Sequence, residues 1–350
     1  MKDEERKKMF KDVFAPKSGE KILFLIDIPH KNIKDTDVWR ARRAMAQDWY
    51  RAFKELGKEI GFSVNLLEYN ATGMNSSPLP QTLVDELRVN HLVIAMTEYS
   101  ATPTLVHISK KEGSITRCAS MPGVEKRMEE TAFKADYREV RRYANAIEHM
   151  LNNAVGASIV FSTGDNLYID LRNRIAGSDD GDCSQTGQCI NFPSGEAWKT
   201  PYEATPEEIS EFGPSKTEGI MPVSYDNELL KFIIRNNQII KVIGEDEKAE
   251  EMRIFFLEEE TRRNIAELGI GCNPNAVVTG NVLEDEKVGG LHIAYGMSVH
   301  LGGKVKSDMH QDICYPKGLP VESTTLNLIN KNGSKTELIH KAMLRYELLK

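Results

Sequence analysis

Histidines and aspartates gather in one short stretch of this 350-residue chain. The segment HIAYGMSVHLGGKVKSDMHQD, residues 292–312, contains two aspartates and three of the eight histidines: His292, His300 and His310. Neutral imidazole beside carboxylate is the usual ligand set for zinc, cobalt or iron. The stretch therefore predicts a metal site whose remaining ligands come from elsewhere in the chain.

The histidines differ in what their neighbours imply. His310 and Asp312 are two positions apart, so in an extended strand both side chains leave the same face and can reach one ion. Alternation in HIAYG puts His292 on the side of Ala294, where small neighbours leave room around the imidazole. The alternatives are an ordinary surface pair for the HxD, a hydrogen-bonded core histidine for His292 and a loop histidine for His300.

Two glutamates are candidate partners. Glu267 has apolar neighbours at the predicted junction between a helix and a Gly-rich turn at Gly269 and Gly271, and a carboxylate in apolar company needs a cation or hydrogen-bond donors. Glu196 follows a Pro and a Gly in INFPSGEAWKTP, which mark a tight turn that can present the carboxylate. Glu218 is a weaker candidate of the same kind. A helix-end glutamate facing water and a solvated loop acid are the alternatives for the first two.

Composition excludes several classes of function. The net charge of -7 and the pI near 5.7 argue against a nucleic-acid partner. The charged N-terminus MKDEERKKMFKDVF lacks the apolar core of a signal peptide, and no run approaches 18 apolar residues, so we expect a cytoplasmic protein without a membrane partner. Five scattered cysteines indicate neither a disulfide framework nor a tetrathiolate zinc site.

The length favours two domains. Residues 1–155 predict an α/β domain with a mainly parallel sheet, because the apolar run 21–28 is typical of a buried strand and 37–57 has helical spacing. Residues 156–350 predict an α+β, β-rich metal-binding domain. Its predicted elements are hairpins at 157–171 and 230–244, a surface loop at 176–189 and a charged helix at 244–267.

Several motifs, in this order, resemble the aminopeptidase T family of metal-dependent aminopeptidases: NFPSGE, TEGIMP, NIAELGIGCNPNA, TGNVLEDEKVGG, HIAYG and the closing HxD. The resemblance covers roughly residues 156–315, whereas residues 1–150 agree only in fold type. It implies a homodimeric metallo-aminopeptidase that acts on a peptide with a free N-terminus. It also implies two divalent ions, zinc or cobalt, with magnesium or manganese as alternatives. Five residues match the family's metal ligands: Glu196, Glu267, His292, His310 and Asp312.

One position departs from the family. Val299 stands where the family has a tyrosine, and His300 follows it. Either His300 takes over that place, or the second metal position is incomplete.

In the two-ion mechanism that the resemblance implies, ions about 3.5–4 Å apart hold a bridging water, lower its pKa and polarise the scissile carbonyl. Glu196 is then a ligand or the general base. Tyr295 and His300 are candidates for the partner of the oxyanion.

A second class competes with this interpretation. The same superfamily resemblance includes 2,5-dihydroxypyridine dioxygenases, ring-cleaving enzymes with a single iron, which have histidine at the position of Glu267. The additional ligands Glu267, Glu196 and His292 favour two divalent ions over one iron. A third alternative is a metal-binding protein without peptidase activity, in which the segments 176–189 and 244–267 contact partners.

Overall fold

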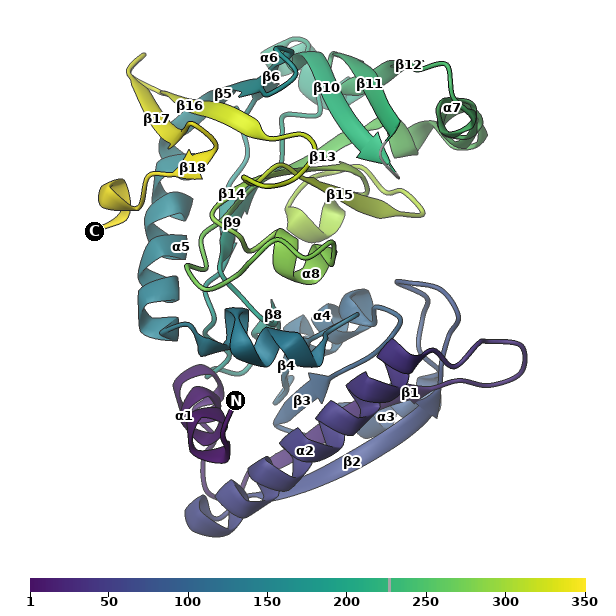
Figure 1. Ribbon diagram of the computed structural model, residues 1–350, viewed down its shortest axis with the longest axis vertical. Helices are drawn as coiled ribbons and strands as arrows, with labels where there is room; N and C mark the ends of the chain where they lie inside the picture. Colours follow the sequence, from purple (N-terminus) through teal and green to yellow (C-terminus); the bar gives the residue numbers. More distant parts are fainter. Residues whose placement is uncertain (226–227) are drawn as a thin grey trace. The chain divides into compact units, whose positions relative to one another are not determined.

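The computed structural model describes residues 1–225 and 228–350, which form two compact units (Figure 1). One unit contains Met1–Arg141, Asp179–Ser194 and Pro274–Val277, and the other contains Arg142–Ser178, Gly195–Asn273 and Val278–Lys350. The first is an α/β unit with a parallel sheet and the second has antiparallel sheets, in agreement with the predicted fold classes. Within the described residues, none of the helices combines the length and apolar character that crossing a membrane requires.

Sheet A of the first unit has five parallel strands in the order β2-β1-β3-β4-β8. Its strands are β1 (Lys21–Ile28), β2 (Ser63–Asn70), β3 (Leu92–Ala95), β4 (Arg117–Ser120) and β8 (Cys189–Asn191). Six of the eight residues of β1 are buried, as expected for a strand that is covered on both faces. The predicted strand at 21–28 and the parallel arrangement are confirmed.

Helices cover both faces of sheet A. Helix α2 begins after Thr36, whose side chain accepts a hydrogen bond from the Trp39 backbone N–H, and it ends at Ile60, before Gly61 with φ 97°. Its Phe53 packs on Phe24 of β1 at a ring distance of 5.6 Å. Side chains of α3 and α4 pack with Leu23 and Leu25, which point to the other face. The helical elements are α1 (Asp3–Phe14), α2 (Asp37–Ile60), α3 (Gln81–Leu87), α4 (Thr102–Lys110), η1 (Lys126–Glu130), η2 (Ala132–Lys134) and the first part of α5 (Tyr137–Asn153).

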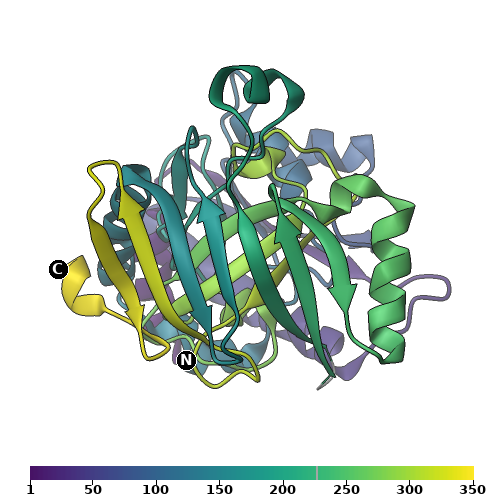
Figure 2. The ribbon, with the colours of Figure 1, turned by 90° about the horizontal axis from the view of Figure 1, so that it is seen from above.

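Sheet B of the second unit is antiparallel, with the order β12-β11-β10-β6-β5-β16-β17-β18, and Figure 2 shows its strands side by side. The two predicted hairpins are confirmed as the pairs β5–β6 and β11–β12. Asn236 and Asn237 turn the second hairpin with φ 50° and 67°, the left-handed conformation that this tight turn needs. The strands are β5 (Ala154–Phe161), β6 (Asn166–Asp170), β10 (Glu218–Tyr225), β11 (Glu228–Arg235), β12 (Gln238–Ile243), β16 (Ser323–Asn330), β17 (Lys335–His340) and β18 (Met343–Leu344).

Sheet C of the same unit has the order β15-β14-β13-β9-β7. One hydrophobic cluster joins inward side chains of sheets B and C with those of α5 and α7, so one face of sheet C is packed in a core. The strands are β7 (Ala176–Asp179), β9 (Glu196–Lys199), β13 (Ile265–Gly271), β14 (Gly290–Gly296) and β15 (His310–Cys314). The helical elements of this unit are α6 (Pro206–Phe212), α7 (Glu247–Glu258), α8 (Val282–Asp285), η3 (Glu260–Arg263), η4 (Val299–Leu301) and η5 (Tyr346–Leu349).

Three predicted segments differ from the structure. The helix predicted at 244–267 is limited to α7, which Asp246 caps and which ends at Glu258, before the extended backbone of Glu259. The predicted Gly-rich turn around Glu267 is strand β13, because pairing with both β9 and β14 satisfies its backbone. The predicted surface loop 176–189 contains β7 and the start of β8, and Cys183 within it is fully buried.

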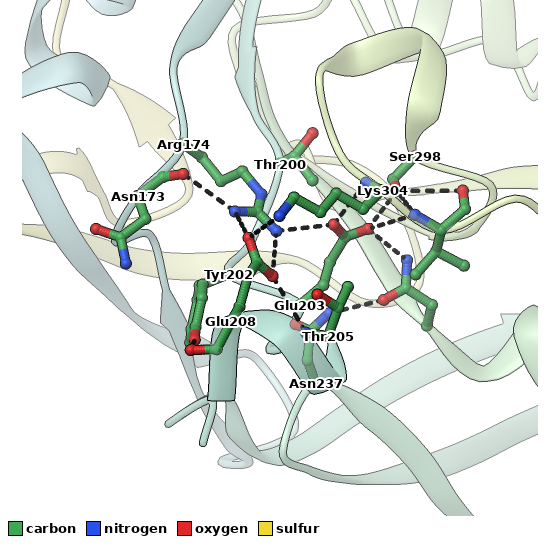
Figure 3. A network of polar contacts seen from close by, with 12 residues as sticks. Asn173, Arg174, Thr200, Tyr202, Glu203, Thr205, Glu208, Asn237, Ser298 and Lys304 are labelled. Atoms are coloured by element: carbon green, nitrogen blue, oxygen red, sulfur yellow. Dashed lines mark hydrogen bonds and ion pairs between the residues drawn. The ribbon is translucent and has the colours of Figure 1, made fainter. Parts of the chain in front are cut away.

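A buried polar network holds the loop 297–309, which connects β14 to β15 (Figure 3). Glu203 accepts hydrogen bonds from the Ser298 hydroxyl, from the Lys304 backbone N–H at 2.7 Å and from Arg174 at 2.9 Å. Arg174 is also paired with Glu208 at 2.7 Å. Because charged groups need partners when buried, this network fixes the path of the loop into β15.

We predict that Glu203→Gln lowers the free energy of unfolding by roughly 1–3 kcal/mol. The NH2 group of glutamine is a donor, so it cannot accept the hydrogen bonds that the carboxylate of Glu203 accepts. Urea unfolding measures this loss. Glu207→Gln, an exposed acid on α6, is the matched control and should change stability by less than about 0.5 kcal/mol. Equal stability of the two variants would contradict the anchoring role of Glu203.

Candidate metal centre

The predicted ligands lie on one face of sheet C. Strand β14 runs between β13 and β15, and its Ala294 is paired with Glu267 on one side and with Asp312 on the other. His292 lies two residues before Ala294 and therefore on the same face. The same alternation and register place two further predicted ligands on this face, Glu196 and His310.

The donor atoms of four of these side chains converge. Nε2 of His292 lies 3.3 Å from Oε1 of Glu267, and Nε2 of His310 lies 3.2 Å from Oε2 of Glu267. His310 Nε2 is also 3.5 Å from Oδ1 of Asp312. One ligand atom each of Glu267, His292 and Asp312 lie within 4.8 Å of one another. Ligands about 2.0–2.2 Å from a common ion lie at comparable mutual distances, so these residues fit a divalent metal ion.

Both imidazoles direct Nε2 toward the carboxylates. His310 Nδ1 lies 2.7 Å from the Met297 carbonyl, and by donating its proton there it leaves the Nε2 lone pair for an ion. His292 occupies the space over Gly269, where an added methyl group would lie 1.8 Å from its Nε2. Its buried Nδ1 has no hydrogen-bond partner among the described residues. Thus a carbonyl orients one ring and the shape of the sheet surface orients the other.

Burial and mutual charge shift the pKa values of the cluster. Burial raises the pKa of Glu267, but hydrogen bonds from His292 and His310 outweigh it and hold this pKa far below its usual value. Burial lowers the pKa of His292, whereas Glu267 and other nearby carboxylates raise it to about 9. The pKa of His310 is raised in the same way by Asp312 and Glu267. In metal-free protein, therefore, imidazolium protons supply the positive charge that an ion would otherwise bring.

Glu196 has a different partner. Its Oε2 lies 3.4 Å from Nε2 of His292, but its Oε1 lies 2.5 Å from the ammonium nitrogen of Lys287. This ammonium is also 2.7 Å from Oε1 of Glu286, and the Lys287 side chain is fully buried. Burial raises the pKa of Glu286 to about 8, against the opposing charge of Lys287. Glu196 thus connects the four converging ligands to a buried ammonium.

The two candidates for the oxyanion partner lie in different surroundings. Tyr295 points to the opposite face of β14 from His292, where its hydroxyl is 2.9 Å from that of Tyr225 and its ring packs in the hydrophobic cluster. The structure therefore does not bring Tyr295 to the metal centre. His300 is exposed, and its ring centroid lies 4.7 Å from that of His310. It stands at the edge of the centre, next to Val299 in η4.

Sequence reasoning missed Lys287 and Glu286. Both lie in the motif TGNVLEDEKVGG, directly after α8. One signal was available in the sequence. Lys287 precedes an apolar residue and two glycines, and a lysine that is buried among such residues needs acidic partners. Only the folded chain shows that one of those partners is Glu196, 91 residues earlier.

No protein-family model and no curated protein sequence matches the chain. Among the solved structures that share its fold are a dioxygenase and AmpT. The 2,5-dihydroxypyridine dioxygenase from Pseudomonas putida KT2440 has a TM-score of 0.69 and 16% sequence identity, with 100% of both chains covered. Wild-type AmpT from Thermus thermophilus has a TM-score of 0.63 and 13% identity, with 98% of both chains covered. The fold is thus common to an aminopeptidase-like protein and a dioxygenase, and the choice of chemistry depends on the site.

We predict that Gly269→Ala weakens metal binding by at least about 10–100-fold, because the added methyl group displaces the imidazole of His292. Calorimetric titration with Zn²⁺ measures the change. The matched control is Ile270→Val, which trims a buried side chain on the other face of β13 and should reduce stability by about 0.5–1.5 kcal/mol without changing zinc affinity. Unchanged zinc affinity in Gly269→Ala would remove His292 from the ligand set.

A second prediction concerns pH. A histidine whose pKa is raised in the folded state stabilises the protein fully below its ordinary pKa of 6.5, and this stability is lost as the pH rises through the folded value of about 9. The Tm of EDTA-treated protein should therefore fall between pH 6.5 and 9.5. Zn²⁺ should reverse the trend, because binding requires unprotonated imidazoles.

Two variants isolate the source of this pH dependence. His292→Gln should make the decline in Tm of the EDTA-treated protein less steep, because only the contribution of His310 remains, whereas the exposed control His340→Gln should keep the full decline. An identical decline in both variants would show that His292 is not its cause.

Proposed function

We propose that this protein is a metal-dependent aminopeptidase that hydrolyses the N-terminal peptide bond of peptides. The observation that carries the proposal is the convergence of two imidazoles and two carboxylates, those of His292, His310, Glu267 and Asp312, on one face of sheet C. The motifs that resemble the aminopeptidase T family contain these residues, and the similarity of fold to AmpT extends over nearly the whole chain. A homodimer remains a prediction from the sequence.

Glu196 and His300 have separate proposed roles in hydrolysis. A divalent ion bound here would activate a water molecule and polarise the scissile carbonyl. Glu196 faces the four ligands with Oε2, while Lys287 holds its other oxygen, so we assign Glu196 as the acceptor of the proton from the water and its donor to the leaving amine. We assign His300, exposed at the edge of the centre, as the donor to the developing oxyanion.

The test compares leucine arylamide with its N-acetyl form after the protein has been loaded with Zn²⁺ or Co²⁺. We expect cleavage of the free amine alone, because an aminopeptidase must recognise the α-ammonium group. Asp312→Ala should lose both metal and activity, whereas the control His91→Ala, in the first unit, should keep both. Equal cleavage of both substrates would indicate an endopeptidase or amidase, and no cleavage would remove the aminopeptidase assignment.

A single-iron dioxygenase is the second candidate. His292, His310 and Asp312 form a set of two histidines and one carboxylate, the donors that oxygen-dependent iron enzymes use. The fold similarity to 2,5-dihydroxypyridine dioxygenase agrees with this candidate. Oxygen consumption with 2,5-dihydroxypyridine after loading with Fe²⁺ under anaerobic conditions, together with no arylamide cleavage, would favour it over the peptidase.

A further inference from the structure

Lys287 is a cation built into the metal centre. Its side chain is fully buried, and its ammonium lies 2.5 Å from Oε1 of Glu196 and 2.7 Å from Oε1 of Glu286. The backbone of the residue is fixed as well, since its N–H donates to the Glu284 carbonyl and its own carbonyl accepts from the N–H of Asn273. The ammonium therefore has a defined position that follows from the fold of α8 and the chain after it.

This position conflicts with a second ion held by Glu196. One oxygen of Glu196 is already bound by the ammonium, and the other lies 3.4 Å from Nε2 of His292. A protonated lysine has three donors and no acceptor, so it cannot serve as a metal ligand beside Glu196. The positive charges of the ammonium and of a metal ion a few ångströms away would also repel each other strongly in a buried site. A divalent ion doubles this repulsion relative to a monovalent one.

We infer that the ammonium of Lys287 takes the place of a second metal ion, so that the centre binds one divalent ion through Glu267, His292, His310 and Asp312. Glu196 then lies outside the ligand set and is positioned by Lys287. The inference rests on the metal centre of the proposed function, and it replaces the expectation of two ions with one ion and one fixed ammonium.

The alternative is that Lys287 is an ordinary buried ion pair with no bearing on metal number. Lys287→Met removes the charge and keeps most of the apolar length of the side chain. Lys199→Met is the matched control, because Lys199 is also buried in this unit but its ammonium donates to the carbonyls of Leu151 and Ala154 rather than to carboxylates. Glu196→Gln tests separately whether Glu196 is a ligand.

The experiment dialyses full-length protein against buffered free Zn²⁺ and measures zinc per chain by mass spectrometry, with affinities from calorimetry. We expect one zinc per chain in the wild type and in Lys199→Met, and two in Lys287→Met. The double variant Lys287→Met/Glu196→Gln should return to one. Glu196→Gln alone should keep one zinc with a Kd within about threefold of the wild type, whereas loss of a ligand costs about 10–100-fold.

Other outcomes separate the inference from the proposed function. Two zinc ions in the wild type would overturn the role of Lys287 and leave a metal-dependent aminopeptidase standing. No zinc in the wild type would overturn both. One zinc in folded Lys287→Met would also overturn the inference. If Lys287→Met does not fold, a loss of zinc affinity of about tenfold or more in Glu196→Gln would overturn it, because Glu196 would then be a ligand.

Discussion

The metal centre depends on the antiparallel register of three strands. Ala294 of β14 is paired with Glu267 on one side and Asp312 on the other, so both carboxylates lie on the face of the small Ala294 side chain, with ligand atoms within 4.8 Å of each other. A slip of one residue would turn every one of these side chains into the hydrophobic cluster on the other face. The apolar residues Leu291 and Ile293 resist such a slip, because they fill the core between sheets B and C. Core packing and ligand placement are therefore two results of one register.

Local pattern predicted the parts of the site that depend on alternation alone. The HxD pair is extended, with His310 and Asp312 on one face, and His292 points away from the core as the HIAYG pattern indicated. Glu267 was predicted as a candidate residue, but its element was not. The run IAELGIG is a strand because β9 and β14 pair with it from both sides, and a pairing between distant segments leaves no local signature.

Contacts between buried charged groups and partners far away in the sequence were the least predictable feature. Lys287 lies 91 residues from Glu196, and the buried carboxylate of Glu203 accepts a hydrogen bond from the Lys304 backbone N–H, 101 residues later. Composition indicated only that buried charges must find partners, and it could not choose among the many acids of the chain.

The fixed ammonium also bears on the choice between hydrolysis and oxygen chemistry. The dioxygenase and AmpT share this fold, so the fold alone does not decide between hydrolysis and oxygen chemistry, and the side chains of the candidate centre must decide. Glu267 would add an anionic ligand where the dioxygenase resemblance has an imidazole, and such a ligand would favour a hard or borderline divalent ion over redox cycling of iron. Lys287 holds Glu196 beside the candidate ligands, and in our inference Glu196 is positioned there without binding the ion. A single Lewis acid with a positioned carboxylate beside it is an arrangement that can activate water, and it needs no second ion to do so.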